Sequence, residues 1–425
     1  MFYQEKNQPE KAILIGITNP ALKSQTAGFW AELAELTCSA GGDVVGRVVQ
    51  PRENPDPALF IGSGKVEELA GLVREEAADI VIAAQELSPV QARNLTDLTG
   101  VKVIDRTGLI LDIFAQRAHT REGKLQVELA QLNYLLPRLS NSGFHFSRLG
   151  GGIGTRGPGE TKLEVDRRRI RRRIGDLQRE LSAAELHRKV QRQLREKNRI
   201  PTVALVGYTN AGKSTLFNKL TAAAVSARGR LFDTLDPVSR LVRLPDNRRI
   251  IILDTVGFIS DLPHQLVAAF KATLEETVRS SILLQVMDAS SPDLAEQYLA
   301  VRKVLAELKI ETKETINVLN KIDLLDSPNT TRRLAQEWSA IPVSAKYDPS
   351  VEQLIAEIQN RLAAKITTCR LLLPFSEGGL LDLLHRKSRI LEEVFTEEGI
   401  NLLVEMEPSL AGKYRRFFIR EERNA

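Results

Sequence analysis

The chain has 425 residues, enough for about three domains. Its 43% hydrophobic and 27% charged residues exclude a disordered or fibrous protein. It has no apolar run near the ~20 residues of a membrane-spanning helix, and its polar start, MFYQEKNQPEK, argues against a signal peptide. Two cysteines, Cys38 and Cys369, exclude a disulfide framework and are predicted to be small core residues, so we expect a cytoplasmic protein.

Residues 1–110 are predicted to form a parallel α/β domain. Four apolar runs predict buried strands, namely AILIGI, DVVGRVV, DIVIAA and VKVID. Helices are predicted between them at 25–36, 65–76 and 89–98. The segment Gly62–Lys65 opens one of these helices without the spacing of a P-loop, so a phosphate contact and a plain helix cap both stay open.

Residues 111–199 are predicted to form a helical hairpin. Two heptad-like stripes predict its helices: Leu125, Leu129, Leu132, Leu136 and Leu139, then Ile170, Ile174, Leu177 and Leu181. Pro137 is expected to distort or end the first helix near its C-terminus. Neither helix can bury its stripe alone, so the two should pack antiparallel.

The tip of this hairpin, about 140–160, is a candidate RNA contact. It is rich in glycine and interleaves aromatic and basic side chains: Phe144, His145, Phe146, Arg148 and Arg156. Such side chains suit splayed RNA bases and phosphates. Six arginines follow within seven positions: Arg167, Arg168, Arg169, Arg171, Arg172 and Arg173. A charge run is often only a solvated face, but beside this loop an RNA contact is favoured.

A phosphate-binding loop is predicted between the strand-like run VALV and the helix-like run LFNKL. Its residues are Gly207, Tyr208, Thr209, Asn210, Ala211, Gly212, Lys213, Ser214 and Thr215. Glycines let the backbone approach, and successive N–H groups point at the negative charge. Lys213 is expected to reach the outer phosphates and the Ser214 hydroxyl to ligate Mg²⁺.

Three further segments complete a guanine-nucleotide domain over 200–365, for which we expect a mixed, mostly parallel sheet. They comprise Asp254, Thr255, Val256 and Gly257, then Asn320, Lys321 and Asp323, then Ser344, Ala345 and Lys346. Asp254 is expected to hold Mg²⁺ through water, and the Gly257 N–H to contact the γ-phosphate. Asp323 would accept two hydrogen bonds from guanine, which adenine cannot offer. All follow strand-like runs, at the sheet edge where open α/β sheets bind ligands.

Two more units follow the same patterns. The runs SRLVRL and RRIIIL, separated by Pro245–Asn247, predict a β-hairpin that links both nucleotide switches. Residues 366–425 are predicted to form a small α+β domain with strands RLLLP and INLLVEM and helices at 380–385 and 410–417. Its role stays open between an RNA or protein contact and a buttress.

These motifs resemble the translation-factor-related GTPases. The stretch GGGIGTRGPGETKLEVDRRR is similar to the signature of the ribosome-associated HflX family, and FIGSGKVEEL, DRTGLILDIFAQRAHTREGKLQVELAQL and LFDTLDP extend the likeness over nearly the whole chain. The resemblance implies a P-loop GTPase that dissociates or rescues stalled or idle ribosomes, in some members under stress. Its hairpin loop would reach the large ribosomal subunit near the peptidyl-transferase centre. The family also suggests ATP at the N-terminal domain, and we expect a monomer.

The resemblance also bears on catalysis. Thr234 matches the switch threonine that closes over Mg²⁺ and the γ-phosphate, although it also suits a turn cap. Lys213, Thr234 and Gly257 are thus the candidate catalytic residues. Phe258 stands where Ras-like GTPases carry a water-orienting glutamine, so we expect slow intrinsic turnover and activation by the ribosome. Asn210 matches an asparagine that binds K⁺ in related GTPases, which leaves K⁺ activation open.

Three other functions compete with this interpretation. A tRNA-modification GTPase would suit Asn210 but needs a cofactor site and commonly a catalytic cysteine, for which Cys369 is poorly placed. An ATP-dependent RNA helicase would need motifs that the chain lacks. A GTP-switched scaffold with negligible hydrolysis stays open if no activator compensates for Phe258.

Overall fold

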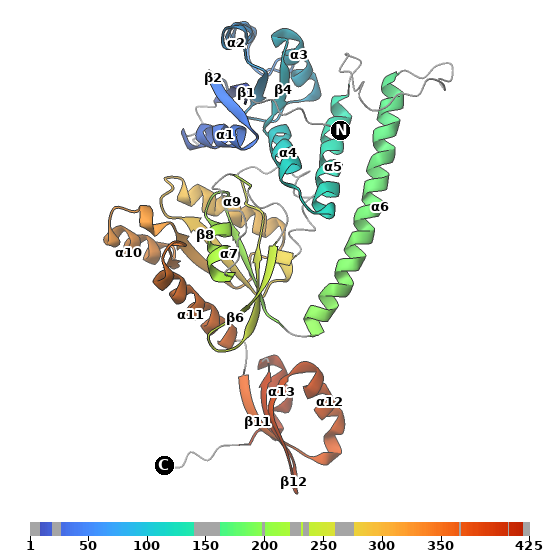
Figure 1. Cartoon of the computed structure of the whole chain (residues 1–425), viewed down its shortest axis with the longest axis vertical. Coiled ribbons are helices and arrows are strands. Elements are labelled where there is room, and N and C mark those ends of the chain that lie inside the picture. The colour runs from blue at the N-terminus through green and yellow to red at the C-terminus, as the bar shows by residue number, and fades with distance from the viewer. Residues whose placement is uncertain are drawn as a thin grey trace.

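The computed structural model shows three sheets along one long axis, with a helical pair beside the first two (Figure 1). It describes residues 9–18, 27–139, 162–197, 200–221, 231–232, 238–259, 276–364, 367–406 and 408–419. The predicted tip loop at 140–160 and Thr234 therefore lie outside the described residues.

The first sheet is parallel, with strand order β2-β1-β3-β4. Its strands are β1 (Glu10–Thr18), β2 (Gly42–Pro51), β3 (Ile80–Ala83) and β4 (Lys102–Asp105), and its helices are α1 (Ala27–Ser39), α2 (Ser63–Glu76) and α3 (Pro89–Thr99). Helix α3 begins at a capping box, in which the Ser88 hydroxyl accepts from the Gln91 N–H and Gln91 accepts from the Ser88 N–H. The predicted parallel α/β fold is confirmed.

A helix that the apolar periodicity did not indicate, α4 (Arg106–Arg117), follows this sheet. It begins where the Asp105 carboxylate caps it by accepting from the Gly108 N–H at 2.9 Å. Its apolar residues are buried around most of its circumference, as Leu109, Ile110, Leu111, Ile113 and Phe114 show. A helix enclosed on several sides lacks the one-sided stripe that identifies surface helices.

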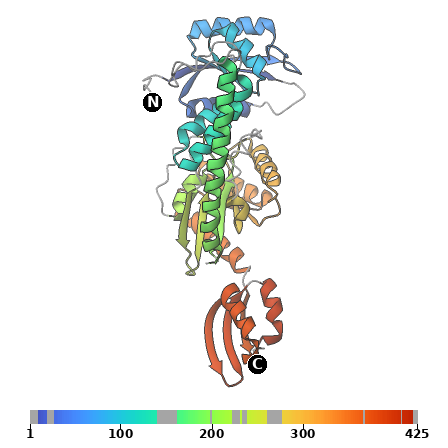
Figure 2. The same cartoon turned by 90° about the vertical axis from the view of Figure 1, so that its right-hand side faces the viewer.

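The helical pair consists of α5 (Arg121–Leu135) and α6 (Lys162–Lys197), seen side by side in Figure 1, while in Figure 2 the long α6 runs in front. Arg173 pairs with Glu128 at 2.7 Å, and Arg121 with Glu180 at 3.5 Å. The start of α5 therefore lies beside a later part of α6 than the middle of α5 does, so the two helices run antiparallel, as predicted. Helix α5 ends before Pro137, as predicted, with a turn of 3₁₀ helix at Leu136–Arg138.

The middle sheet has six strands in the order β10-β9-β8-β5-β7-β6, all parallel except β6. Its strands are β5 (Thr202–Gly207), β6 (Val238–Arg243), β7 (Arg249–Asp254), β8 (Ile282–Asp288), β9 (Thr315–Asn320) and β10 (Ala340–Pro342). Its helices are α7 (Lys213–Thr221), α9 (Leu294–Glu307), α10 (Pro328–Glu337) and α11 (Asp348–Ala364), with a 3₁₀ turn at Ile322–Leu324. The predicted hairpin of β6 and β7 is confirmed, and so is the mostly parallel sheet.

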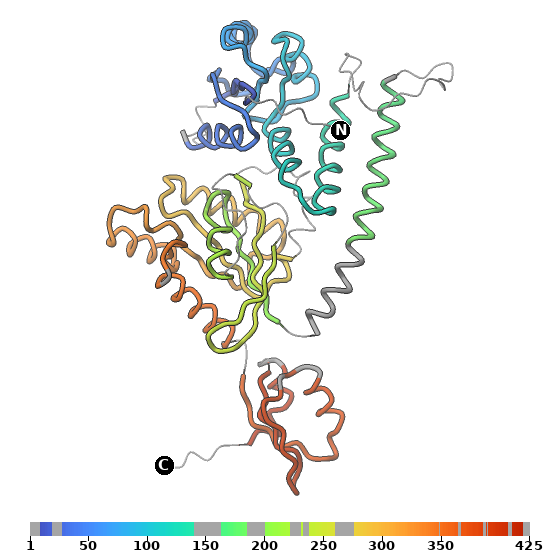
Figure 3. Tube along the Cα trace, viewed as in Figure 1, coloured from blue at the N-terminus to red at the C-terminus, as the bar shows by residue number. Residues whose placement is uncertain are grey.

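The third sheet is antiparallel, in the order β11-β13-β12, and is separate in the tube of Figure 3. Its elements are β11 (Thr367–Leu373), β12 (Arg389–Thr396), β13 (Gly399–Met406), α12 (Gly378–Lys387) and α13 (Pro408–Tyr414), with 3₁₀ turns at Phe375–Glu377 and Arg415–Phe417. Leu371, Leu402, Val404 and Tyr414 form its core. The α+β class is confirmed, but strand β12 was not predicted.

Two further findings concern single residues and helices. Cys369 is buried as predicted, but Cys38 is exposed, so that prediction was wrong. Helix α1 buries Trp30, Leu33, Leu36 and Thr37, and at 100° per residue Cys38 falls outside this face. None of the described helices is long and apolar enough to cross a membrane.

Candidate guanine-nucleotide site

The P-loop connects β5 to α7 and packs against the NKID segment. Gly212 has φ +87°, and a Cβ there would lie 2.3 Å from Nδ2 of Asn320. That amide donates to the Ala211 carbonyl at 2.9 Å, while Oδ1 of Asn320 accepts from the Ala345 N–H at 3.3 Å. A glycine is therefore required at 212, and the phosphate loop and the base-binding segments are braced by one asparagine.

Lys213 is buried and is the first residue of α7, directly after Gly212. Its Nζ donates to the Tyr208 carbonyl at 2.7 Å. Burial lowers the pKa of Lys213 to about 8, although the nearby Asp254 carboxylate acts in the opposite direction. A buried ammonium that donates to a backbone carbonyl can exchange that carbonyl for phosphate oxygens.

Ser214 and Asp254 meet at the edge of the sheet. The Ser214 hydroxyl donates to the Asp254 carboxylate at 2.8 Å, and Asp254 is fully buried at the end of β7. Hydroxyl and carboxylate oxygens are the ligands that Mg²⁺ prefers, usually together with water and phosphate oxygens. The donor set thus fits this metal.

Asp323 lies on the base side of the site. It accepts from the Ser344 hydroxyl at 2.8 Å and pairs with Lys346 at 3.1 Å. Burial acts against ionisation, but these two partners hold the pKa of Asp323 below its usual range. The carboxylate is therefore charged at neutral pH and positioned by the SAK segment. Lys321, of the same NKID segment as Asp323, pairs with Asp288 at 2.8 Å.

The DTVG segment returns to the P-loop. A Cβ on Gly257 would lie 2.9 Å from the Thr209 Cα and 3.2 Å from the Lys213 Nζ. The Thr255 hydroxyl donates to the Leu205 carbonyl, and Val256 is buried. The structure thus places the backbone after Asp254 directly against the phosphate loop.

Phe258 packs its ring into a hydrophobic core and contacts the P-loop through its backbone. It is only 2% exposed, its N–H donates to the Gly207 carbonyl at 3.0 Å, and its carbonyl accepts from the Thr209 N–H at 2.7 Å. Its ring belongs to a hydrophobic cluster with Val256 and Ile259. The backbone of residue 258 therefore links the P-loop to the second switch, while its ring packs in the hydrophobic core.

The N-terminal domain reaches this site through α1, as no motif predicted. Glu32 accepts hydrogen bonds from the Tyr208 hydroxyl and from Arg106, the latter at 2.5 Å. Glu35 accepts from Nδ2 of Asn210 at 3.2 Å. Burial raises the pKa of Glu35 above its usual value. The positive charge of Lys321 lowers this pKa, and the negative charge of Glu32 raises it further. Two carboxylates from another domain therefore lie against the phosphate loop.

An apolar contact accompanies these polar ones. The Phe114 ring of α4 meets the Phe232 ring edge to face, with centroids 4.7 Å apart. Phe232 lies just before Thr234, and both Phe114 and Phe232 belong to the cluster that contains Phe258. One hydrophobic core thus joins α4 to residues beside both predicted switches.

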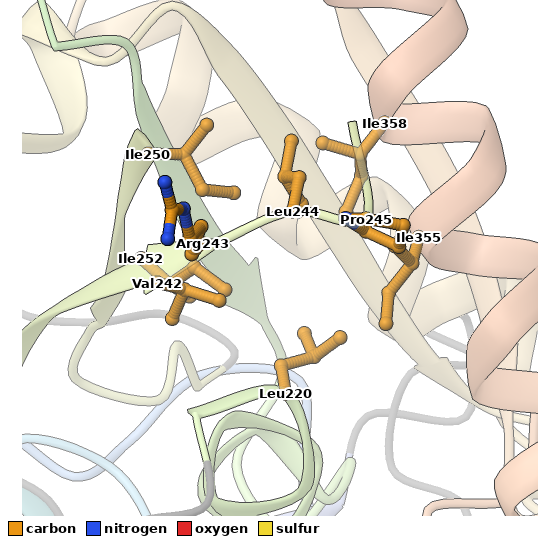
Figure 4. A pocket seen from close by; sticks show the side chains of 9 residues that line it. All are labelled: Leu220, Val242, Arg243, Leu244, Pro245, Ile250, Ile252, Ile355 and Ile358. Carbon is orange, nitrogen blue, oxygen red and sulfur yellow. The ribbon is translucent and has the colours of Figure 1, made fainter. Parts of the chain in front are cut away.

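The site is distinct from the apolar cavity of the same domain. Leu220, Leu244, Ile355 and Ile358 line that cavity, between the C-terminal end of α7, the β6–β7 hairpin and α11 (Figure 4). It lies at the end of α7 opposite the P-loop, and Arg243 is the one polar side chain among the residues that line it. The cavity therefore does not suit a phosphate-bearing ligand.

Comparison with known proteins decides the family. Three family models match successive parts of the chain: GTP-binding GTPase N-terminal at 29–115, GTP-binding GTPase Middle Region at 117–195 and 50S ribosome-binding GTPase at 202–321. GTPase HflX of Caldanaerobacter subterraneus is 47% identical over 96% of this chain and 94% of its own length. The chain belongs to the HflX GTPase family.

A second curated relative supports the same family. GTPase HflX of Escherichia coli is 46% identical over 88% of this chain and 89% of its own length. A GTP-binding protein from Sulfolobus solfataricus, solved in complex with GDP, is 27% identical, with a TM-score of 0.45 over 83% of this chain and 98% of that one. As a member of the HflX family, this protein hydrolyses GTP and binds guanine nucleotides.

Proposed function

We propose that this GTPase binds the large ribosomal subunit and promotes the dissociation or rescue of stalled or idle ribosomes. The observation that carries the proposal is the arginine face of α6. Arg169, Arg171 and Arg172 are exposed and, among the described residues, have no acidic partner, whereas Arg173 is paired with Glu128. Unpaired arginines beside a Gly-rich segment suit ribosomal RNA. The match to a 50S ribosome-binding GTPase model supports the same target.

In this proposal the nucleotide site works as its motifs suggest. Lys213 neutralises the outer phosphates, the N–H groups of 207–215 cradle them, and Asp323 with Ser344–Lys346 selects guanine. Ser214, Thr234 and Asp254 would hold Mg²⁺, which supplies charge neutralisation when bound. Support comes from the buried Lys213 and from the contact between Ser214 and Asp254.

Turnover is proposed to be slow until a partner binds. Phe258 is committed to a hydrophobic cluster and has no group that orients water. The ribosome would supply or reposition the missing group, with K⁺ beside Asn210 as a second activator. Equal turnover in K⁺ and Na⁺ buffers would remove the cation from this scheme.

A mechanical route from nucleotide to hairpin is also proposed. Ordering of the switches would change the packing of Phe232 and Phe258 against Phe114, because these residues share one core. Helix α4 leads directly to α5, so the hairpin would respond to the nucleotide. Interfaces packed in this way tend to have two discrete arrangements rather than a continuum.

A binding experiment tests the arginine face. The change is Arg171→Ala with Arg172→Ala, and co-sedimentation with purified large subunits in a non-hydrolysable GTP analogue should weaken roughly tenfold, with a smaller salt slope. Arg332→Ala with Arg333→Ala, at exposed positions on α10, is the matched control and should bind normally. Equal loss in both pairs, or in neither, would remove α6 from the interface.

A further inference from the structure

The C-terminal sheet has one closed edge and one open edge. At the outer edge of β11, Leu371 pairs with Phe418 and the Ile419 N–H donates to the Arg370 carbonyl at 2.9 Å. Along β12 the situation differs, since among the described residues no strand pairs with its outer side. An open edge offers unpaired N–H and C=O groups that can accept another strand.

Three apolar side chains of β12 are exposed. Leu391 is 40% exposed, Val394 is 56% exposed and Phe395 is 66% exposed. Charged side chains, proline or a bulge commonly protect such edges. Between Ile390 and Gly399 no proline occurs and the charged residues are all glutamates, so a basic partner strand would not be repelled. One bulge, at Ile390–Glu392, is the irregularity that the pairing of β12 shows. The apolar side chains at the open edge therefore have the character of an interaction site.

The charge of the β12 region determines what kind of partner it can bind. Four glutamates and no basic residue lie between Ile390 and Gly399: Glu392, Glu393, Glu397 and Glu398. Arg370 lies 3.4 Å from Glu392 and His385 lies 3.6 Å from Glu393, while Glu397 and Glu398 at the turn have no partner among the described residues. Nucleic-acid phosphates would be repelled. Two copies that paired through this edge would bring like charges together, which disfavours self-association.

We propose that the β12 edge binds an extended segment of a partner protein that is basic and carries apolar side chains, and that this segment adds a strand to the sheet. Its lysines or arginines would meet the glutamates, and its apolar residues would cover Val394 and Phe395. The choice of the large ribosomal subunit as the target rests on the proposed function. On that subunit, the β12 edge would contact a ribosomal protein and not ribosomal RNA. The two ends of the molecule would then recognise different components of one target.

Site-specific photo-crosslinking tests this surface. The full chain carries Phe395→p-benzoylphenylalanine and is irradiated with purified large subunits in a non-hydrolysable GTP analogue. The matched control carries the same amino acid at Leu299 of α9, which is 65% exposed. A crosslink from position 395, and not from 299, to a basic segment of a ribosomal protein supports the proposal. A crosslink from 395 to RNA or to a second copy overturns it, as does no crosslink while the protein still co-sediments.

A second variant removes the apolar contact without a cavity. Val394→Ser with Phe395→Ser should weaken co-sedimentation about tenfold and leave thermal stability unchanged, because both side chains are mostly exposed. Leu299→Ser is the control. Unchanged binding overturns the proposal. If the unaltered protein fails to co-sediment at all, the proposed ribosomal function fails first, and this assignment of the partner fails with it.

Discussion

The predicted nucleotide site has two parts: the four short motifs of the middle domain, here called the motif wall, and the helices α1 and α4, here called the N-terminal wall, which contact the P-loop and Phe232. The motif wall presents N–H groups and the buried Lys213, all of which attract phosphate. The N-terminal wall presents Glu32, Glu35 and the apolar ring of Phe114. We infer that the motif wall binds the nucleotide and that the N-terminal wall responds to whether it is bound.

Changing the base-recognition residue of the motif wall should have the largest effect. Asp323→Asn removes the carboxylate that would pair with guanine, and GTP affinity should fall by roughly 1,000-fold or more, because a polar site left unpaired discriminates strongly. Xanthosine triphosphate should restore binding, since its base offers an acceptor where guanine offers a donor. Asp326→Asn, at an exposed position three residues later, is the control and should bind GTP normally. Competition binding measures all three.

Removing one side chain from the hydrophobic core that the two walls share should affect the two walls differently. Phe114→Ala removes a buried ring, and a cost of about 3 to 5 kcal/mol is expected. The loss should appear as faster amide exchange in α1 and around Tyr208, while GDP affinity changes little. Phe217→Ala, buried wholly within the middle domain, should instead destabilise the P-loop and reduce GDP affinity. Identical exchange patterns for the two variants would contradict a distinct interdomain core.

The pH dependence of binding probes the motif wall. Burial lowers the pKa of Lys213 to about 8. Below pH 8 the Lys213 amine is already protonated, whereas above pH 8 it must take up a proton when the nucleotide binds. GDP affinity should therefore be flat from pH 6.5 to 7.5 and weaken by up to about tenfold per unit above pH 8. Calorimetry in two buffers of different ionisation enthalpy should show proton uptake. A flat affinity up to pH 9.5 would contradict the buried, desolvated ammonium.

Removing one charge from the N-terminal wall should have the smallest effect, and the opposite sign. Glu35→Gln keeps the hydrogen bond to Asn210 but removes a negative charge beside the phosphates, so GTP affinity should rise about threefold to tenfold. Glu75→Gln, at an exposed position on α2, should change nothing. Weaker binding by Glu35→Gln would show that the carboxylate assists the nucleotide.

The two walls also differ in how far the sequence predicts them. Glycine spacing and strand ends are local features, so the P-loop, the β6–β7 hairpin and the antiparallel helices were predictable. Contacts such as those of Glu32 with Tyr208 and of Phe114 with Phe232 join residues more than 100 positions apart, and nothing local marks them. Helix α4 was missed because it is enclosed on several sides, and β12 because its glutamates interrupt the apolar alternation.

The central claim is that this GTPase works on the large ribosomal subunit through its hairpin. The measurement that tests it most directly is the rate of GTP hydrolysis with and without purified large subunits, for the full chain and for a variant without Gly151–Gly154. Strong stimulation that disappears in the variant, with unchanged GDP affinity, is the predicted result. No stimulation of the full chain, or equal stimulation of both proteins, would contradict the claim.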